Sequence, residues 1–260
     1  TMNVTGNDSF VVGRFVGAEG GAFTLASGTM QADEVDLANG LLTVNGGATL
    51  STFSGQLFTT ALNAEGTNGE AGDLRYGADH LSFGSGSTLT LRDEFYNVDY
   101  VNDAQGLLGD VHITLTGTEV DAQGQEVTEK PLDQMPENTT LVNTTITAEA
   151  DSNGTVTIGS SVGGKDLVVD EDATSVAVSE DKTFTLVGSS EGGELIRNKN
   201  GDAVESVAVS GGLTLGEATA DPGSGTISGT ISVKSNANLT SQNGEYEVGT
   251  VNATDAQVNV

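Results

Sequence analysis

Two short runs of carboxylates are the first residues of this sequence with the chemistry to bind an ion. One is Asp-Glu-Val-Asp at residues 33–36, and the other is Asp-Glu-Asp at residues 170–172. Carboxylate oxygens suit hard cations such as Ca²⁺. However, neither run lies in an EF-hand loop or in a Gly-Gly-x-Gly-x-Asp array. We therefore predict no metal or other cofactor, with Asp170 and Asp172 as the residues that would hold a calcium ion.

A small group of aromatic residues is the second candidate site. Phe95, Tyr96 and Tyr100 lie close together in a chain that is only 5% aromatic, and they follow the acidic pair Asp93-Glu94. Aromatic side chains on a loop often carry binding function. The alternative is that they pack the base of a loop against the scaffold. We predict Phe95, Tyr96 and Tyr100 as ligand-binding residues.

Residues for nucleophilic catalysis are scarce. His80 and His112 are the only histidines, neither lies in a Gly-x-Ser-x-Gly context, and the chain has no cysteine. The lack of cysteine also removes disulfides and thiolate metal sites. We therefore predict no catalytic residues and a protein that is not an enzyme.

The elements that would position these residues are short strands in an irregular repeat. Ser-Val-Ala-Val-Ser occurs at residues 175–179 and again at residues 206–210, a shift of 31 residues from 175 to 206. Thr-x-Thr steps begin at residues 88, 116 and 145, and at 155 and 183, so successive steps are 28 or 29 residues apart except between 145 and 155. Such an interval holds two or three strands with their turns, which predicts one coil of a stacked solenoid.

The run Leu-Thr-Val-Asn-Gly-Gly-Ala-Thr-Leu-Ser at residues 42–51 combines two alternating strands with a Gly-Gly turn. Beside the repeats, we interpret it as a corner between two faces of one coil rather than as a hairpin. Further strands are predicted by the same alternation. They cover residues 10–16, 57–62, 88–91, 111–115, 140–147, 155–158, 167–169, 183–186, 213–215, 226–233, 245–251 and 256–260.

The predicted fold is therefore all-β, a right-handed parallel β-helix (β-solenoid) with loop excursions. No sustained helical periodicity interrupts the strand pattern. We predict one solenoid domain over residues 1–260, with excursions at residues 92–110 and 119–138, where the alternation breaks down.

The charge of the chain narrows its partners. It carries 37 acidic and 9 basic residues, for a formal net charge of −28. Nucleic acids and anionic membranes would repel such a surface, so we predict no nucleic-acid partner and no membrane insertion. No apolar run approaches the length of a membrane-spanning helix, and no signal peptide is evident. The chain is expected to be a fragment of a longer rod.

Three segments resemble the degenerate repeats of autotransporter passengers, in particular AIDA-type and pertactin-type adhesins. They are LTVNGGATLS at residues 42–51, SGGLTLGEAT at 210–219 and ISVKSNANLT at 231–240. The resemblance implies a β-helical passenger on the surface of a Gram-negative bacterium, or secreted from it. It further implies a role in adhesion, autoaggregation, biofilm formation or virulence, and export through an outer-membrane barrel.

The sequence thus predicts a cell-surface adhesin that attaches to a host surface glycan or matrix protein, or to another copy of itself. Two alternatives remain open. One is a polysaccharide-active β-helix enzyme of the lyase type, although the nine bases are scattered and the acidic surface would repel a polyanionic substrate. The other is a structural spacer that holds a functional tip away from the cell.

Overall fold

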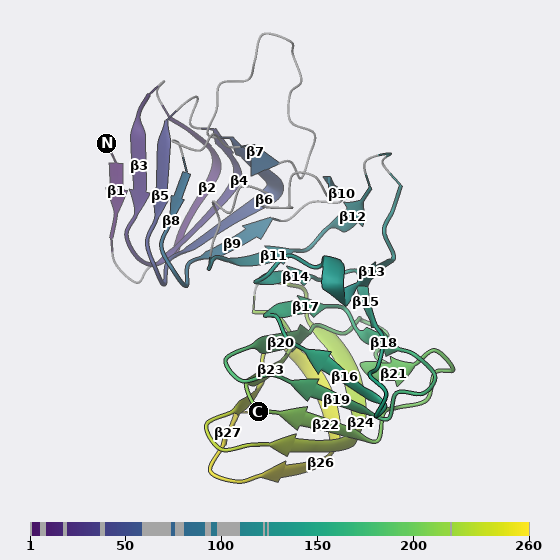
Figure 1. Ribbon diagram of the computed structural model, residues 1–260. Helices are drawn as coiled ribbons and strands as arrows, with labels where there is room; N and C mark the ends of the chain where they lie inside the picture. The colour runs from purple at the N-terminus through teal and green to yellow at the C-terminus, as the bar shows by residue number, and fades with distance from the viewer. Residues whose placement is uncertain are drawn as a thin grey trace. The chain divides into compact units, whose positions relative to one another are not determined.

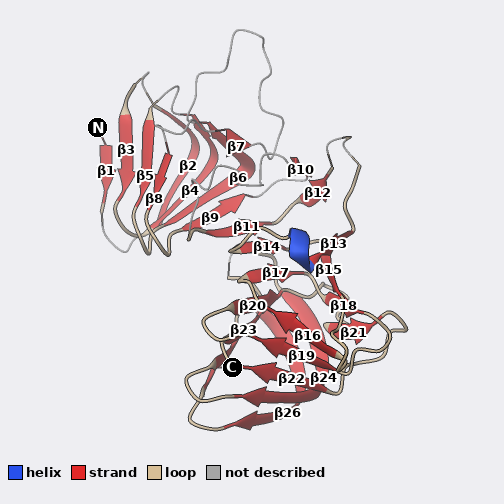
Figure 2. Cartoon of the chain, viewed as in Figure 1, coloured by secondary structure: helices blue, strands red, loops and turns tan. Residues whose placement is uncertain are grey.

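Short parallel β-strands make up almost the whole of the computed structural model of the protein (Figures 1 and 2). It describes residues 2–5, 9–17, 20–36, 40–58, 74–75, 81–91, 95–97, 110–121, 123, 125–218 and 220–259. Every paired strand within these ranges runs parallel to its neighbours, as stacked coils require. The predicted all-β solenoid is confirmed.

The chain divides into two compact units, Thr1–Val127 and Thr128–Val260. In the first unit, one sheet has the strand order β1-β3-β5-β8, a second has β2-β4-β6-β9-β11 with β7 beside β6, and a third pairs β10 with β12. The strands are β1 (Met2–Val4), β2 (Ser9–Val16), β3 (Ala22–Leu25), β4 (Thr29–Asp36), β5 (Leu41–Val44), β6 (Thr49–Phe58), β7 (Leu74–Arg75), β8 (Leu81–Phe83), β9 (Thr88–Leu91), β10 (Phe95–Asn97), β11 (His112–Leu115) and β12 (Thr118–Val120).

The second unit has three sheets. Their orders are β13-β15-β18-β21, β16-β19-β22-β24-β26 and β14-β17-β20-β23-β25-β27. The elements are β13 (Glu129–Pro131), the 3-10 turn η1 (Leu132–Gln134), β14 (Thr139–Leu141), β15 (Thr145–Ala148), β16 (Thr155–Ile158), β17 (Val162–Gly164), β18 (Leu167–Val169), β19 (Ser175–Val178), β20 (Thr183–Leu186), β21 (Ile196–Asn198), β22 (Ser206–Val209), β23 (Gly212–Leu215), β24 (Gly223–Val233), β25 (Asn238–Ser241), β26 (Gly244–Ala253) and β27 (Gln257–Asn259).

Each coil of the second unit visits these sheets in a fixed order. From β15 the chain passes to β16, then β17, then back to the first sheet at β18, and the next coil repeats the order with β19, β20 and β21. Because neighbouring coils stack through parallel pairing, each sheet gains one strand per coil. The arrangement gives the unit three flat faces around one narrow core (Figure 1).

The core consists of ladders of inward side chains, one residue from each coil. Val156, Val176, Val207 and Ile231 stand in register across four strands and are each 1% exposed or less. Alternate positions along these strands point outward, since successive side chains of a strand point to opposite sides. Burial of branched side chains against the coils above and below is therefore the main stabilising term.

The exact duplicate found in the sequence forms two stacked strands. Ser175 pairs with Ser206 and Val178 with Val209, so the repeated residues lie directly over one another. The sequence repeat therefore predicted both the neighbour and the register of β19.

The corner predicted at residues 42–51 is also confirmed. β5 pairs with β3 and β8, whereas β6 pairs with β4 and β9, so the two strands belong to different sheets. Gly47 takes a φ of +81° between them, which a residue without Cβ adopts without strain. At the equivalent corners of the second unit, Asp181 and Asn236 take φ values of 58° and 66°, as these residue types tolerate.

Two sequence predictions about strands are wrong. The Thr-x-Thr steps do not stack on one another, because Thr145 lies in β15, Thr155 in β16 and Thr183 in β20, which belong to three different sheets. Residues 140–147 do not form one strand either. They span parts of β14 and β15, separated by a turn at Val142 and Asn143 where the Thr144 N–H donates to the Leu141 carbonyl at 3.2 Å.

The segments predicted as excursions contain regular structure where they are described. Within residues 92–110, β10 pairs in parallel with β12, and apart from Asp110 the rest lies outside the described residues. Within residues 119–138, Val120 and Glu126 form an antiparallel bridge around the Asp121 carboxylate, which accepts two backbone N–H groups. The later part of that segment is β13 and η1.

Close stacking of the coils makes one glycine position testable. A Cβ at Gly211 would collide with the carbonyl oxygens of Lys182 and Ser179 in the adjacent coil, whereas a Cβ at Gly159 would meet open space. We expect Gly211→Ala to lower the free energy of unfolding by about 1–3 kcal/mol. Gly159→Ala should change it by less than about 0.5 kcal/mol. Urea denaturation of the full chain measures both, and equal effects would contradict the stacking.

Candidate functional site

A row of hydroxyl groups crosses the outer face of the sheet β16-β19-β22-β24-β26. The row comprises Thr155, Ser175, Ser206, Thr230 and Thr250, which stand in register on the five strands. Adjacent strands place such residues about 4.8 Å apart. The first four side chains are half-buried and the fifth is exposed, so the hydroxyl row forms a flat, solvent-accessible polar strip.

Local hydrogen bonds fix the start of this row. The Asp151 carboxylate accepts the N–H groups of Asn153 at 2.8 Å and of Thr155 at 3.0 Å, which closes the turn that leads into β16. The Thr155 and Ser175 hydroxyls then meet at 2.8 Å. The turn therefore sets the register in which β16 begins and where its first hydroxyl lies.

Acid should weaken this turn. Hydrogen bonds from the Thr155 N–H and then the Asn153 N–H hold the pKa of the Asp151 carboxyl below its ordinary value. A carboxyl with a depressed folded pKa adds stability that is present above its unfolded pKa, about 3.9, and is lost as pH falls through the folded value. We expect Asp151→Ala to lower the urea midpoint at pH 7 and the gap to narrow below pH about 3. A gap that stays constant with pH would contradict this.

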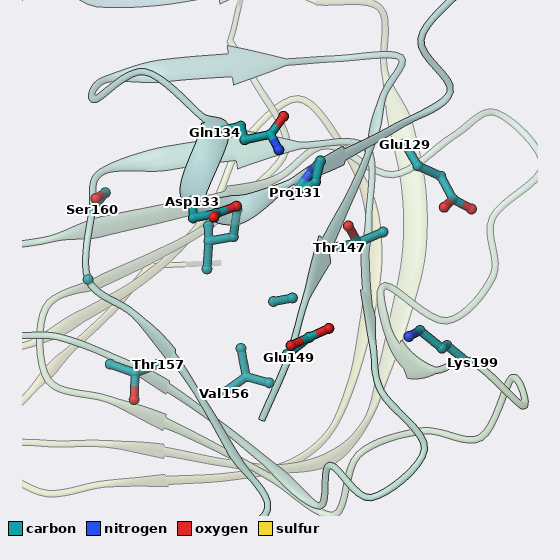
Figure 3. Close-up of a pocket in the computed structure, with 13 residues that line it drawn as sticks. Glu129, Pro131, Asp133, Gln134, Thr147, Glu149, Val156, Thr157, Ser160 and Lys199 are labelled. Atoms are coloured by element: carbon teal, nitrogen blue, oxygen red, sulfur yellow. The ribbon is translucent and has the colours of Figure 1, made fainter. Parts of the chain in front are cut away.

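A cleft opens beside β16, at the end of the hydroxyl row (Figure 3). Its volume is about 780 Å³, within the usual range for ligand sites. We call it the edge cleft. It is lined by Glu129, Pro131, Leu132, Asp133, Gln134, Thr147, Ala148, Glu149, Val156, Thr157, Gly159, Ser160 and Lys199.

The side chains of the edge cleft are mainly acidic and polar. Glu129, Asp133 and Glu149 supply three carboxylates and are exposed, and Lys199 is the one basic residue of the lining. In Figure 3, Asp133 lies on η1 on one side of the cleft and Glu149 follows β15 on the other. The lining contains no aromatic residue. The cleft therefore suits a ligand with positive charge and hydrogen-bonding groups better than a flat apolar one.

The residues predicted from sequence as binding sites lie elsewhere in the chain. Phe95 and Tyr96 belong to β10, where they pair with Thr118 and Glu119 of β12, and Tyr100 lies outside the described residues. Their role in ligand binding stays a prediction. His80 is also outside the described residues, whereas His112 is exposed in β11, as an outward-facing residue should be.

The predicted calcium ligands occupy a turn. The Asp170 carboxylate accepts the Ala150 N–H at 3.1 Å and so links two coils, while the Asp172 side chain is exposed. No group of three or more His, Asp or Glu side chains in the described ranges comes together as a metal site. Asp170 thus has a structural hydrogen bond that its sequence pattern did not suggest.

Sequence reasoning missed the edge cleft. One signal was available, because the polar stretch Glu-Lys-Pro-Leu-Asp-Gln at residues 129–134 interrupts the strand alternation. Its meaning depends on which strand would otherwise lie there, and that follows only from the stacking order of the sheets.

Comparisons with family models, curated proteins and solved structures find no match to this chain. The resemblance to autotransporter passengers therefore stays a prediction from sequence texture. Within the described residues, no helix is long and apolar enough to cross a membrane.

Proposed function

We propose that the protein is the binding portion of a bacterial surface adhesin. In this role it would attach cells to a host glycan or matrix protein, or to another copy of itself. The observation that carries the proposal is the hydroxyl row, which repeats one kind of polar group at a regular spacing along a flat face. Each such contact is weak, but many of them add up when several molecules are displayed together on one surface.

The charge of the protein sets the conditions for self-association. At a formal net charge of −28, two copies repel each other at low ionic strength. Salt screens this repulsion over roughly 10 Å at 0.1 M. Contact between copies through their hydroxyl rows should therefore strengthen as salt or a divalent cation is added.

The test uses beads coated with the full chain. We expect the beads to aggregate at high ionic strength, or to be retained on a glycan array or on immobilised matrix protein. Ser175→Lys combined with Ser206→Lys should abolish this binding, because two cations then project from the middle of the hydroxyl row. Asn200→Lys combined with Gln242→Lys adds the same charge in exposed turns and should preserve it.

Two results would overturn the proposal. One is a protein that folds but shows neither aggregation nor retention at any ionic strength, which would favour the spacer alternative. The other is equal loss of binding in both double variants, which would mean that net charge rather than the hydroxyl row controls attachment.

A further inference from the structure

The edge cleft exists because one coil lacks a strand. Glu129 of β13 pairs with Thr145 of β15, only 16 residues later, whereas Ile146 of β15 pairs with Leu167 of β18, 21 residues later. The longer coil includes β16, but the shorter one has η1 at the same point of its path, between β13 and β14. A single 3-10 turn cannot pair with β16, so the position of the missing strand stays open.

As a result, β16 is an edge strand with backbone groups directed into the cleft. Its one partner among the described strands is β19. The Ile158 carbonyl accepts the Ser179 N–H of the coil that contains β19, at 3.0 Å. In a parallel ladder the residues alternate between neighbours, so the N–H and C=O of Thr157 are directed to the opposite side.

Only part of that edge is occupied by the protein itself. The Asp151 turn uses the backbone of Thr155, whose carbonyl accepts the Asp151 N–H at 2.9 Å. Beyond it, Thr157 and Gly159 line the cleft. An exposed row of N–H and C=O groups is a template for one further strand.

We propose that the edge cleft binds an extended, basic peptide segment of a partner protein, which adds to β16 as a parallel strand. The backbone of the segment bonds to Thr157, and its Lys or Arg side chains lie near Asp133 and Glu149. This inference rests on the proposed function as a binding protein and names the class of partner for one part of its surface. Strand addition to an open sheet edge is a common way to recognise peptides.

The chemistry of the cleft favours a peptide over a sugar. Three carboxylates against one lysine attract a cationic chain. The paired N–H and C=O groups of a strand edge match another backbone, and the lining offers no aromatic ring on which a sugar could stack. An oligosaccharide is therefore the competing outcome of the test.

The experiment measures fluorescence anisotropy of a labelled peptide with alternating lysine and valine, titrated with the full chain at physiological salt. We expect saturable binding. The same peptide with proline at every second position should not bind, because proline lacks the N–H that a ladder needs. An alternating glutamate and valine peptide and an unlabelled neutral oligosaccharide serve as the other probes, and neither should bind or compete.

Charge-matched variants separate the cleft from general attraction to an acidic protein. Asp133→Asn with Glu149→Gln should weaken the binding of the lysine peptide about tenfold. Glu191→Gln with Asp202→Asn removes the same charge from exposed loops outside the cleft and should leave binding unchanged. Equal weakening in both double variants, unimpaired binding of the proline peptide, or competition by the oligosaccharide would overturn the inference.

Failure of the inference and failure of the proposed function remain distinguishable. If coated beads still adhere while the lysine peptide does not bind, the edge cleft is not a peptide site, and the hydroxyl row keeps its proposed role. If the peptide binds but the beads do not adhere, the chain recognises peptides without acting as an adhesin.

Discussion

Val207→Asp should lower the free energy of unfolding by at least about 3–5 kcal/mol, or prevent folding altogether. Val207 is completely buried, and it lies between Val176 and Ile231 in the core ladder. No basic side chain is in that ladder to pair with a new carboxylate, so the aspartate would be buried without a partner. Urea denaturation followed by far-ultraviolet circular dichroism measures the loss.

The adjacent residue provides a matched control. Ala208 is half-buried and points to the outer face, next to Ser206 of the hydroxyl row. Ala208→Asp adds the same group to the same strand and should cost less than about 1 kcal/mol, since its carboxylate stays hydrated. If the two substitutions cost the same, the inward and outward assignment of β22 is wrong.

The sequence predicted this register well because the repeat is exact at residues 175–179 and 206–210. Identical residues pack best when they stack directly over each other, and β19 and β22 do so. The corner at residues 42–51 could be predicted for a similar reason, because Gly47 marks a left-handed residue between two alternating runs.

Coil length could not be predicted from spacing. In the second unit, Glu129 pairs with a residue 16 positions later, whereas Val168 of β18 pairs with Arg197, 29 positions later. Turns of different size join the same faces, so the distance between similar motifs does not identify a coil. The Thr-x-Thr steps at Thr145, Thr155 and Thr183 suggested a period for this reason, although they lie on different sheets.

The candidate site was beyond sequence reasoning for a related cause. Asp133 and Glu149 are ordinary exposed carboxylates in the sequence, and what makes them notable is the strand absent between them. The hydroxyl row likewise combines residues from five coils of unequal length. Both features arise from stacking, which the residues determine collectively rather than through any local motif.

The largest fully buried ring of the second unit gives the second strong prediction. Phe184 of β20 is completely buried and pairs with Val162 on one side and Leu213 on the other. Phe184→Ala should lower the free energy of unfolding by about 3–5 kcal/mol, through lost burial and the cavity left behind. Phe184→Leu keeps most of the apolar volume and should cost clearly less.

The location of the damage tests the solenoid more sharply than its size. Each coil contacts mainly the coils above and below it, so the loss at Phe184 should spread along the stack with distance rather than affect the chain uniformly. Hydrogen exchange should therefore show the greatest loss of protection in β17, β20 and β23, and less in β27. Uniform loss of protection across the second unit would mean that its coils unfold as one block and that nearest-neighbour stacking does not describe its stability.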